Sequence, residues 1–155
     1  MTKRKEIFFI VLVTLFSFLL CGCSLTNDRK ACTLSYDDYL NIVQANNYDV
    51  SEYELSLESY PVKQIDVKKG KNFTASYQIF SSSQAVDDIY KNTKKYYARS
   101  CDLKEEFDNG VVFQENLKQV TIIKSNKSIL TMEDSTDNFM QTEKLLNLAT
   151  NQKHF

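Results

Sequence analysis

The fold is decided by residues 111–133, VVFQENLKQVTIIKSNKSILTME, in which three short, largely apolar segments are separated by short connections. Each segment is rich in Val, Ile, Phe and Thr and is too short for a helix, so three strands are predicted. Asn116-Leu117 and Ser125-Asn126 stand where two-residue hairpin connections are expected. This stretch therefore predicts an antiparallel meander.

Two further strands are predicted upstream of the meander. Residues 73–80 alternate apolar and polar side chains, and residues 62–67 form a second β-rich segment. Lys69-Gly70 lies between them at a predicted tight turn. Tyr53, Leu55 and Leu57 alternate with acidic and polar residues, which weakens the prediction of an additional strand there.

Three helices are predicted from capping residues and helical spacing. Ser35 can cap a helix that ends at Asn46-Asn47, with two acidic residues in its first turn. Ser83 is expected to cap a second helix that ends near Arg99. Asp134-Ser135 is expected to begin the last helix.

The predicted fold class is α+β, with the order α-β-β(-β)-α-β-β-β-α. We expect an antiparallel sheet of about five or six strands with helices packed on one face and water on the other. The length of 155 residues suits one domain, which we place at 32–150, followed by a frayed tail at 151–155.

The first 22 residues differ in composition from the rest. The whole chain has 19 basic and 20 acidic residues, and residues 1–22 hold three of the basic ones and one acid. The remainder therefore has 16 basic and 19 acidic groups, a net charge of −3. After the cationic start, residues 7–20 are apolar except for Thr14 and Ser17, too short a run for the ~20 residues that span a bilayer. This pattern predicts an export signal at 1–22.

Leu20-Cys21-Gly22-Cys23 ends the apolar run and resembles the lipobox of bacterial lipoproteins. Leu20 and Gly22 fill the third and the last place before the modified cysteine, whereas Cys21 replaces the usual Ala, Ser or Thr. The resemblance implies a lipid on the thiolate of Cys23, a tether at 23–31 and a place on the outer face of the cell membrane. A plain secretory signal and an uncleaved anchor are the alternatives.

The mature chain is similar to a loose group of small lipoproteins of unknown activity from low-GC Gram-positive bacteria. The similar parts are the lipobox, residues 36–50, residues 73–90, and the strand at 128–132 with the helix after it. The resemblance implies a fold and a location, and it supplies no catalytic residue.

Two cysteines, Cys32 and Cys101, remain in the mature chain. Outside the reducing cytosol a disulfide between them is expected, worth roughly 4 kcal/mol in the chain-entropy model, and two free thiols are the alternative. No metal site or cofactor is expected, because His154 is the only histidine and has no neighbour at metal-ligand spacing.

No catalytic residue is predicted. His154 lies too close to the C-terminus to serve as a rigid base. Adjacent carboxylates, which do not face one another on a helix, are interpreted as solvated charges: Asp37-Asp38, Asp87-Asp88 and Glu105-Glu106. The net charge argues against nucleic acid as a partner. Three lysines could touch anionic lipid or wall polymer, although a solvated hairpin is the simpler interpretation: Lys68, Lys69 and Lys71.

Tyrosine is the one unusual feature of the composition, with nine tyrosines and no tryptophan. Tyr36, Tyr39, Tyr90 and Tyr97 are expected to pack in the core. Four others are the candidate binding surface: Tyr48, Tyr53, Tyr60 and Tyr96. We expect a monomeric, membrane-anchored, non-enzymatic module that binds a protein, a peptide or a cell-wall polymer. A toxin-immunity lipoprotein and a ligand-binding accessory of an envelope or transport system are the alternatives.

Overall fold

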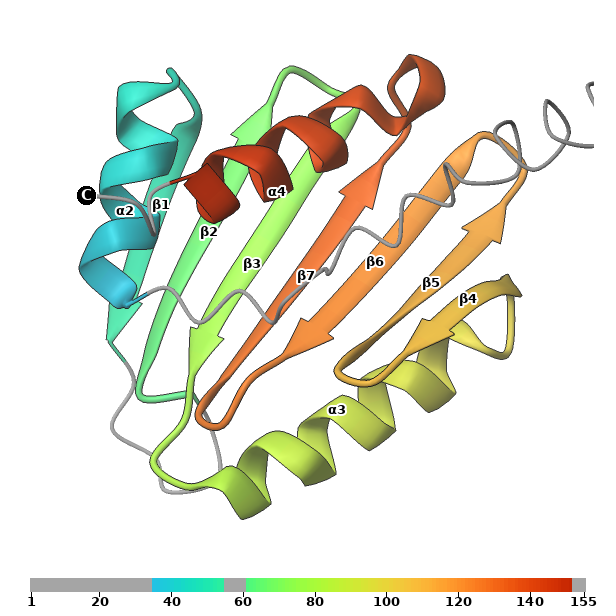
Figure 1. Ribbon diagram of the computed structural model, residues 1–155, viewed down its shortest axis with the longest axis horizontal. Coiled ribbons are helices and arrows are strands. Elements are labelled where there is room, and N and C mark those ends of the chain that lie inside the picture. The colour runs from blue at the N-terminus through green and yellow to red at the C-terminus, as the bar shows by residue number, and fades with distance from the viewer. Residues whose placement is uncertain (1–34, 55–60, 152–155) are drawn as a thin grey trace, which may run out of the picture.

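The computed structural model describes residues 35–54 and 61–151, which form one antiparallel sheet and three α-helices (Figure 1). The expected signal (1–22) and tether (23–31), and all of the expected tail except Asn151, lie outside the described residues. The strands are β1 (Asp49–Glu54), β2 (Lys63–Lys69), β3 (Phe73–Ile79), β4 (Asp102–Phe107), β5 (Gly110–Glu115), β6 (Lys118–Lys124) and β7 (Ser128–Asp134). The helices are α2 (Tyr36–Ala45), α3 (Ser83–Tyr97) and α4 (Met140–Asn151), with a 3₁₀ turn, η1 (Asp137–Phe139), before α4.

The sheet joins two meanders. Its strand order is β1-β2-β3-β7-β6-β5-β4, and every neighbouring pair is antiparallel. The last strands of the two meanders meet at the centre, where Tyr77 of β3 lies opposite Leu130 of β7. The α+β class is thus confirmed, and the sheet has seven strands rather than five or six.

The additional strand, β4, was not predicted. Four of its six residues are charged, and it lies at an edge of the sheet with a bulge between Leu103 and Glu105. Charged side chains and bulges are typical of edge strands, and they remove the apolar alternation on which the prediction depends. β1 begins at Asp49, four residues before the alternation that starts at Tyr53.

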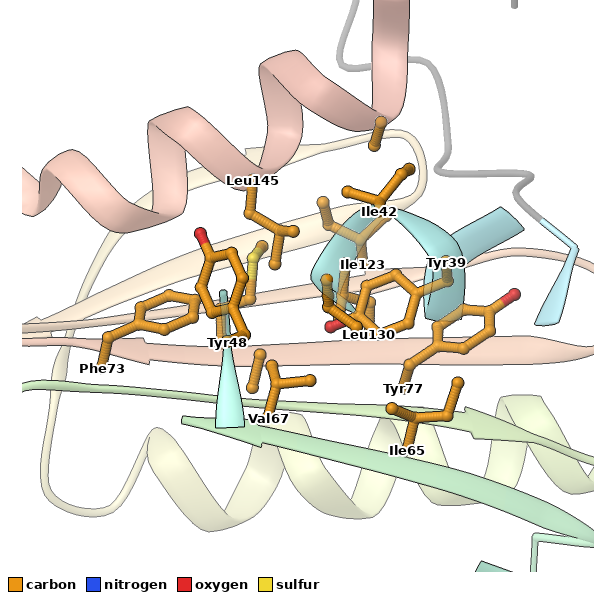
Figure 2. Close-up of a cluster of buried hydrophobic side chains, with 14 residues drawn as sticks. Tyr39, Ile42, Tyr48, Ile65, Val67, Phe73, Tyr77, Ile123, Leu130 and Leu145 are labelled. Atoms are coloured by element: carbon orange, nitrogen blue, oxygen red, sulfur yellow. The ribbon is translucent and has the colours of Figure 1, made fainter. Parts of the chain in front are cut away.

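The main core lies between the sheet and the two helices α2 and α4 (Figure 2). Tyr39 of α2 stacks on Tyr77 of β3 with ring centroids 4.7 Å apart, and Leu145 of α4 is fully buried in the same cluster. We call this side of the sheet the α2 face. Within each strand its residues alternate along the chain, so that their side chains point to this same face: Ile65, Val67, Phe73, Ala75, Tyr77, Ile123, Leu130 and Met132.

A second core lies on the opposite side, which we call the α3 face. Val86 of α3 packs there with strand residues whose side chains point to this second face: Val111, Phe113, Val120, Ile122 and Ile129. Figure 2 shows α3 on the far side of the strands from the main core. The expectation that the helices share one face was therefore wrong, because β5–β7 carry apolar side chains on both faces and need cover on both.

Local sequence signals fix the helix ends. Ser35 caps α2 as predicted, accepting from the backbone N–H of Asp38 at 3.1 Å. α2 ends at Asn46-Asn47, where Asn47 takes a φ of 55° and the ammonium of Lys69 donates to both carbonyls. α3 is capped by Ser82, one residue before the predicted Ser83. Within the described ranges, no helix is long and apolar enough to cross a bilayer.

Candidate functional site

The α3 face of the sheet has two unlike halves. Its β5–β7 half is apolar and packs against α3, whereas its β1–β3 half is polar. Within residues 35–54 and 61–151, no helix is seen over this second half, which we call the open polar half. The register places three rows of side chains on it: Asp49, Lys68 and Thr74; Ser51, Asp66 and Ser76; Tyr53, Gln64 and Gln78.

Amide and carboxylate groups on the open polar half form a short ladder across two strands. The Gln78 amide nitrogen donates to Gln64 Oε1 at 2.9 Å, and the Gln64 amide nitrogen donates to Asp66 Oδ1 at 2.8 Å. The Ser76 hydroxyl is buried and has no hydrogen-bond partner among the described residues. Thr74 and Ser51 are exposed. This surface thus presents hydroxyl, amide and carboxylate groups from neighbouring strands.

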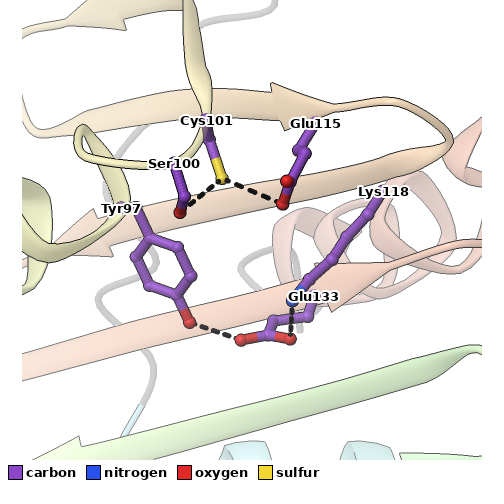
Figure 3. Close-up of polar contacts among 6 residues, drawn as sticks. All are labelled: Tyr97, Ser100, Cys101, Glu115, Lys118 and Glu133. Carbon is purple, nitrogen blue, oxygen red and sulfur yellow. Dashed lines mark hydrogen bonds and ion pairs between the residues drawn. The ribbon is translucent and has the colours of Figure 1, made fainter.

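A charged network borders the open polar half beneath the end of α3 (Figure 3). The ring of Tyr97 stacks on Phe113 at 6.4 Å, and its hydroxyl donates to Glu133 Oε1. The ammonium of Lys118 lies 2.5 Å from the other carboxylate oxygen of Glu133. Thr74 lies directly opposite Glu133 across β3 and β7, so the network adjoins the first polar row.

The network holds both titratable partners in their ordinary protonation states. Burial raises the pKa of Tyr97, and the hydrogen bond to Glu133 with that carboxylate's charge raises it further. Burial alone would raise the pKa of Glu133, but hydrogen bonds from Lys118 and Tyr97 outweigh burial and leave this pKa lowered. Tyr97 therefore stays protonated and Glu133 ionised at neutral pH.

Cys101 lies beside the network at the start of β4. Its Sγ is 3.9 Å from Glu115 Oε2 and 3.7 Å from the Ser100 hydroxyl, and its thiol is free in this structure (Figure 3). Cys32 and the expected lipidation site Cys23 lie outside the described residues. The disulfide between Cys32 and Cys101 stays a prediction, which the mass of the protein before and after reduction tests.

Several titratable side chains of the described residues are held in pairs. The adjacent carboxylates take separate partners, because Asp87 pairs with Lys124 at 2.5 Å and Glu106 pairs with Lys94. Tyr97 holds its proton, and Lys118 is paired with Glu133. Within the described residues, no three His, Cys, Asp or Glu side chains gather in a way that could hold a metal ion.

Three of the four tyrosines that were predicted to form a binding surface lie within the described residues, and these three do not come together. Tyr48 is only 6% exposed and packs against Phe73 in the main core, so it is not a surface residue. Tyr53, 46% exposed, lies on the open polar half, and Tyr96, 65% exposed, lies on α3. Tyr60 lies outside the described residues. Of the three described candidates, only Tyr53 lies on the open polar half.

Comparison with known proteins adds little to this description. No family model matches the chain, and no curated protein matches it. Among solved structures, a crystal structure of a GTP binding regulator from Thermotoga maritima is similar, with a TM-score of 0.44 and 12% identity. The match covers 76% of this chain and 86% of that one. A likeness at this level carries no argument about function.

Proposed function

We propose that this chain is a lipid-anchored, extracytoplasmic binding module without catalytic activity, and that the open polar half is its binding face. One observation carries the binding face: the helices cover opposite faces at opposite sides of the sheet, which leaves the polar rows of β1–β3 uncovered by any described helix. The lipobox Leu20-Cys21-Gly22-Cys23 supports the anchor.

The chemistry of the open polar half favours a polar, largely uncharged ligand. Its uncharged groups are the hydroxyls of Ser51 and Thr74 and the amides of Gln64 and Gln78. Its charged groups have both signs: Asp49, Asp66 and Lys68. Tyr53 adds an exposed ring at one end, which can stack on a sugar or peptide plane. A cell-wall polymer, with hydroxyl and amide groups along its length, offers complementary donors and acceptors.

Two experiments test the two parts of this proposal. Expression with radiolabelled palmitate should label the full chain and the Cys21→Ala variant but not Cys23→Ala; label on Cys23→Ala would refute the anchor. For the binding face, purified protein should co-sediment with isolated cell walls. The double variant Gln64→Ala with Gln78→Ala should lower that binding about tenfold, as expected for the loss of one or two hydrogen bonds.

The matched control for the binding face is Gln84→Ala with Asp88→Ala, which removes a polar pair from the exposed side of α3. This control should bind cell walls like the unaltered protein. Equal losses in both double variants, or no sedimentation of the unaltered protein, would contradict the proposal.

A further inference from the structure

Exposed apolar side chains gather at one end of the sheet. The described residues have six large exposed apolar side chains, and the two aliphatic ones with the greatest exposure are Leu117 at 83% and Met140 at 58%. Leu117 lies in the β5–β6 turn, and Met140 begins α4 after the loop that follows β7. Leu103 and Tyr96 lie toward the same end, at the start of β4 and in the last turn of α3.

The register shows that these loops are neighbours. Gln119, two residues after Leu117, lies opposite Asp134 at the end of β7. Asp134 in turn lies opposite Phe73 at the start of β3. The β5–β6 turn, the β7–α4 loop and the β2–β3 turn therefore stand side by side at this end of the sheet (Figure 1). We call it the Leu117 end. Val62, before β2, marks the opposite end, which we call the Val62 end.

The backbone takes the left-handed conformation directly before both apolar tips. Asn116 has a φ of 51° in the turn that presents Leu117, and Asn138 and Phe139 have φ values of 53° and 54° just before Met140. The left-handed conformation is unfavourable for an aromatic residue such as Phe139. Exposed tips of soluble loops are ordinarily small or polar, so these two tips suit an apolar surface outside the chain.

Cations flank the tips. Lys68 and Lys71 are exposed beside the β2–β3 turn, whereas Lys118, directly after Leu117, is paired with Glu133. Two exposed acids, Glu115 and Asp137, also lie near the tips. A lysine near an anionic bilayer contributes about 1 kcal/mol, and single apolar side chains can enter the boundary between headgroups and acyl chains. Two separate apolar tips with exposed lysines at the neighbouring β2–β3 turn suit a lipid surface, and a second copy of the chain is the alternative occupant that the test below distinguishes.

The proposed anchor permits this contact. Residues 23–34 can reach ~40 Å when extended, and a seven-residue strand such as β7 is ~23 Å long. The chain before α2 is therefore long enough to let the Leu117 end rest on the membrane that holds Cys23. Tethering alone does not select this end, because α2 runs toward it and Ser35, where the tether meets the helix, lies at the far end of α2.

We propose that the Leu117 end docks on an anionic lipid surface, with Leu117 and Met140 entering the headgroup–acyl boundary and Lys68 and Lys71 contacting lipid phosphates. This inference rests on the membrane anchor in the proposed function. Docking by the Leu117 end places the strands roughly perpendicular to the bilayer plane. The open polar half then faces along the membrane surface and stays accessible to a partner.

The test uses the full chain reconstituted in vesicles of phosphatidylcholine and phosphatidylglycerol, the latter carrying a photoreactive diazirine near its glycerol. After irradiation, mass spectrometry compares lipid cross-links at the two ends. Peptides that contain Leu117 and Met140 should carry about fivefold more lipid than peptides that contain Val62 and Lys127, as expected for insertion at one end. Equal labelling of both ends, or protein–protein cross-links at Leu117 in place of lipid, would overturn the proposal.

Matched variants separate insertion from proximity. Leu117→Ser with Met140→Ser should lower the lipid cross-links to the level of the Val62 end, whereas Val62→Ser should leave them unchanged. Both exposed positions tolerate serine, which circular dichroism checks. Lys68→Glu with Lys71→Glu should lower the cross-links in phosphatidylglycerol vesicles, and unchanged labelling would contradict the assigned charge contact.

The two proposals fail in distinguishable ways. If Cys23 is not lipidated, the palmitate label is missing, and the comparison of the two ends can still be made on protein added to the same vesicles. If only the docking is wrong, the palmitate label is present and the two ends are labelled alike.

Discussion

The side chain of Asp134 accepts a hydrogen bond from the backbone N–H of Thr142 at 2.7 Å, so the last residue of β7 caps the first turn of α4. The carboxylate is fully buried, and its other oxygen accepts from the backbone N–H of Thr136 at 2.8 Å and from the Thr136 hydroxyl at 2.5 Å. A carboxylate at a helix N-terminus is favoured by the helix dipole. This one side chain fixes the direction in which α4 leaves the sheet.

We expect Asp134→Ala to lower the free energy of unfolding by about 3 kcal/mol, because two backbone N–H groups lose their acceptor in a buried site. Urea unfolding measures the change. Asp137→Ala, an exposed acid three residues later, is the control and should change stability by less than about 0.5 kcal/mol. Similar values for the two variants would contradict the capping role.

The Tyr97 network should make stability depend on pH in the acid range. The pKa of Glu133 is lowered in the folded protein, so its contribution is present above the unfolded pKa of about 4.5 and is lost as the pH falls through the folded value. Unfolding free energies of the unaltered protein and of Glu133→Gln should differ at pH 6 and converge on acidification. A difference that is constant from pH 6 to pH 3 would contradict this assignment.

Tyrosine ionisation should destabilise the protein at alkaline pH. The pKa of Tyr97 is raised by burial and by Glu133, and that of Tyr36 is raised to about 12 by burial and by its hydrogen bond to Glu52. A raised pKa contributes stability that is present below the unfolded value of 10.0 and is lost as the pH rises through the folded value.

The measurement is ultraviolet titration of tyrosinate in the unaltered protein, Tyr36→Phe and Tyr97→Phe. Each variant should lose one group from the part of the curve above pH 11, and Tyr97→Phe should lose less stability than the unaltered protein between pH 10 and pH 11. Tyr53→Phe serves as the control, since it changes an exposed ring. Loss of a group that titrates near pH 10 from either variant would show that the hydroxyl is not held as described.

Most of the fold could be predicted because its central strands have a clear local sequence pattern. Residues 73–80 and 111–133 carry the apolar alternation and turn residues that β3 and β5–β7 require. β4 could not be predicted in the same way, since an exposed edge strand needs no apolar side. α3 packs on the second face because β5–β7 carry apolar side chains on both faces of the sheet. The sequence shows this feature as consecutive apolar residues in Val111-Val112-Phe113 and Ile122-Ile123.

The candidate site was less accessible to prediction. Tyr97 was expected on the packing side of its helix, and its ring does pack on Phe113, but its partner Glu133 lies 36 residues away on another strand. Gln64, Ser76 and Gln78 were visible only as the polar positions of predicted strands. They became a surface once the register aligned them and α3 was found over the other half of the sheet. Tyr48 was misplaced because a tyrosine hydroxyl can reach Gln141 from within the core.

Gly70 and Gly110 are required for different physical reasons. A Cβ on Gly110 would lie 2.4 Å from two ring carbons of Phe107 and 2.7 Å from the carbonyl oxygen of Ile122. A Cβ on Gly70 would meet nothing within 4 Å, but its φ of +62° disfavours side chains. Gly110 is thus required for close packing, and Gly70 for the conformation of the β2–β3 turn.

We expect Gly110→Ala to cost about 3 kcal/mol of unfolding free energy, because the Ile122 carbonyl belongs to the sheet and cannot move aside. Gly70→Ala should cost about 1 kcal/mol, and Gly70→Asn less, since Asn tolerates the left-handed conformation. Adding Phe107→Leu to Gly110→Ala should recover only part of the loss, because it removes the ring but leaves the backbone contact. Urea unfolding of the four variants measures these differences, and a larger cost at Gly70 than at Gly110 would contradict the steric explanation for Gly110.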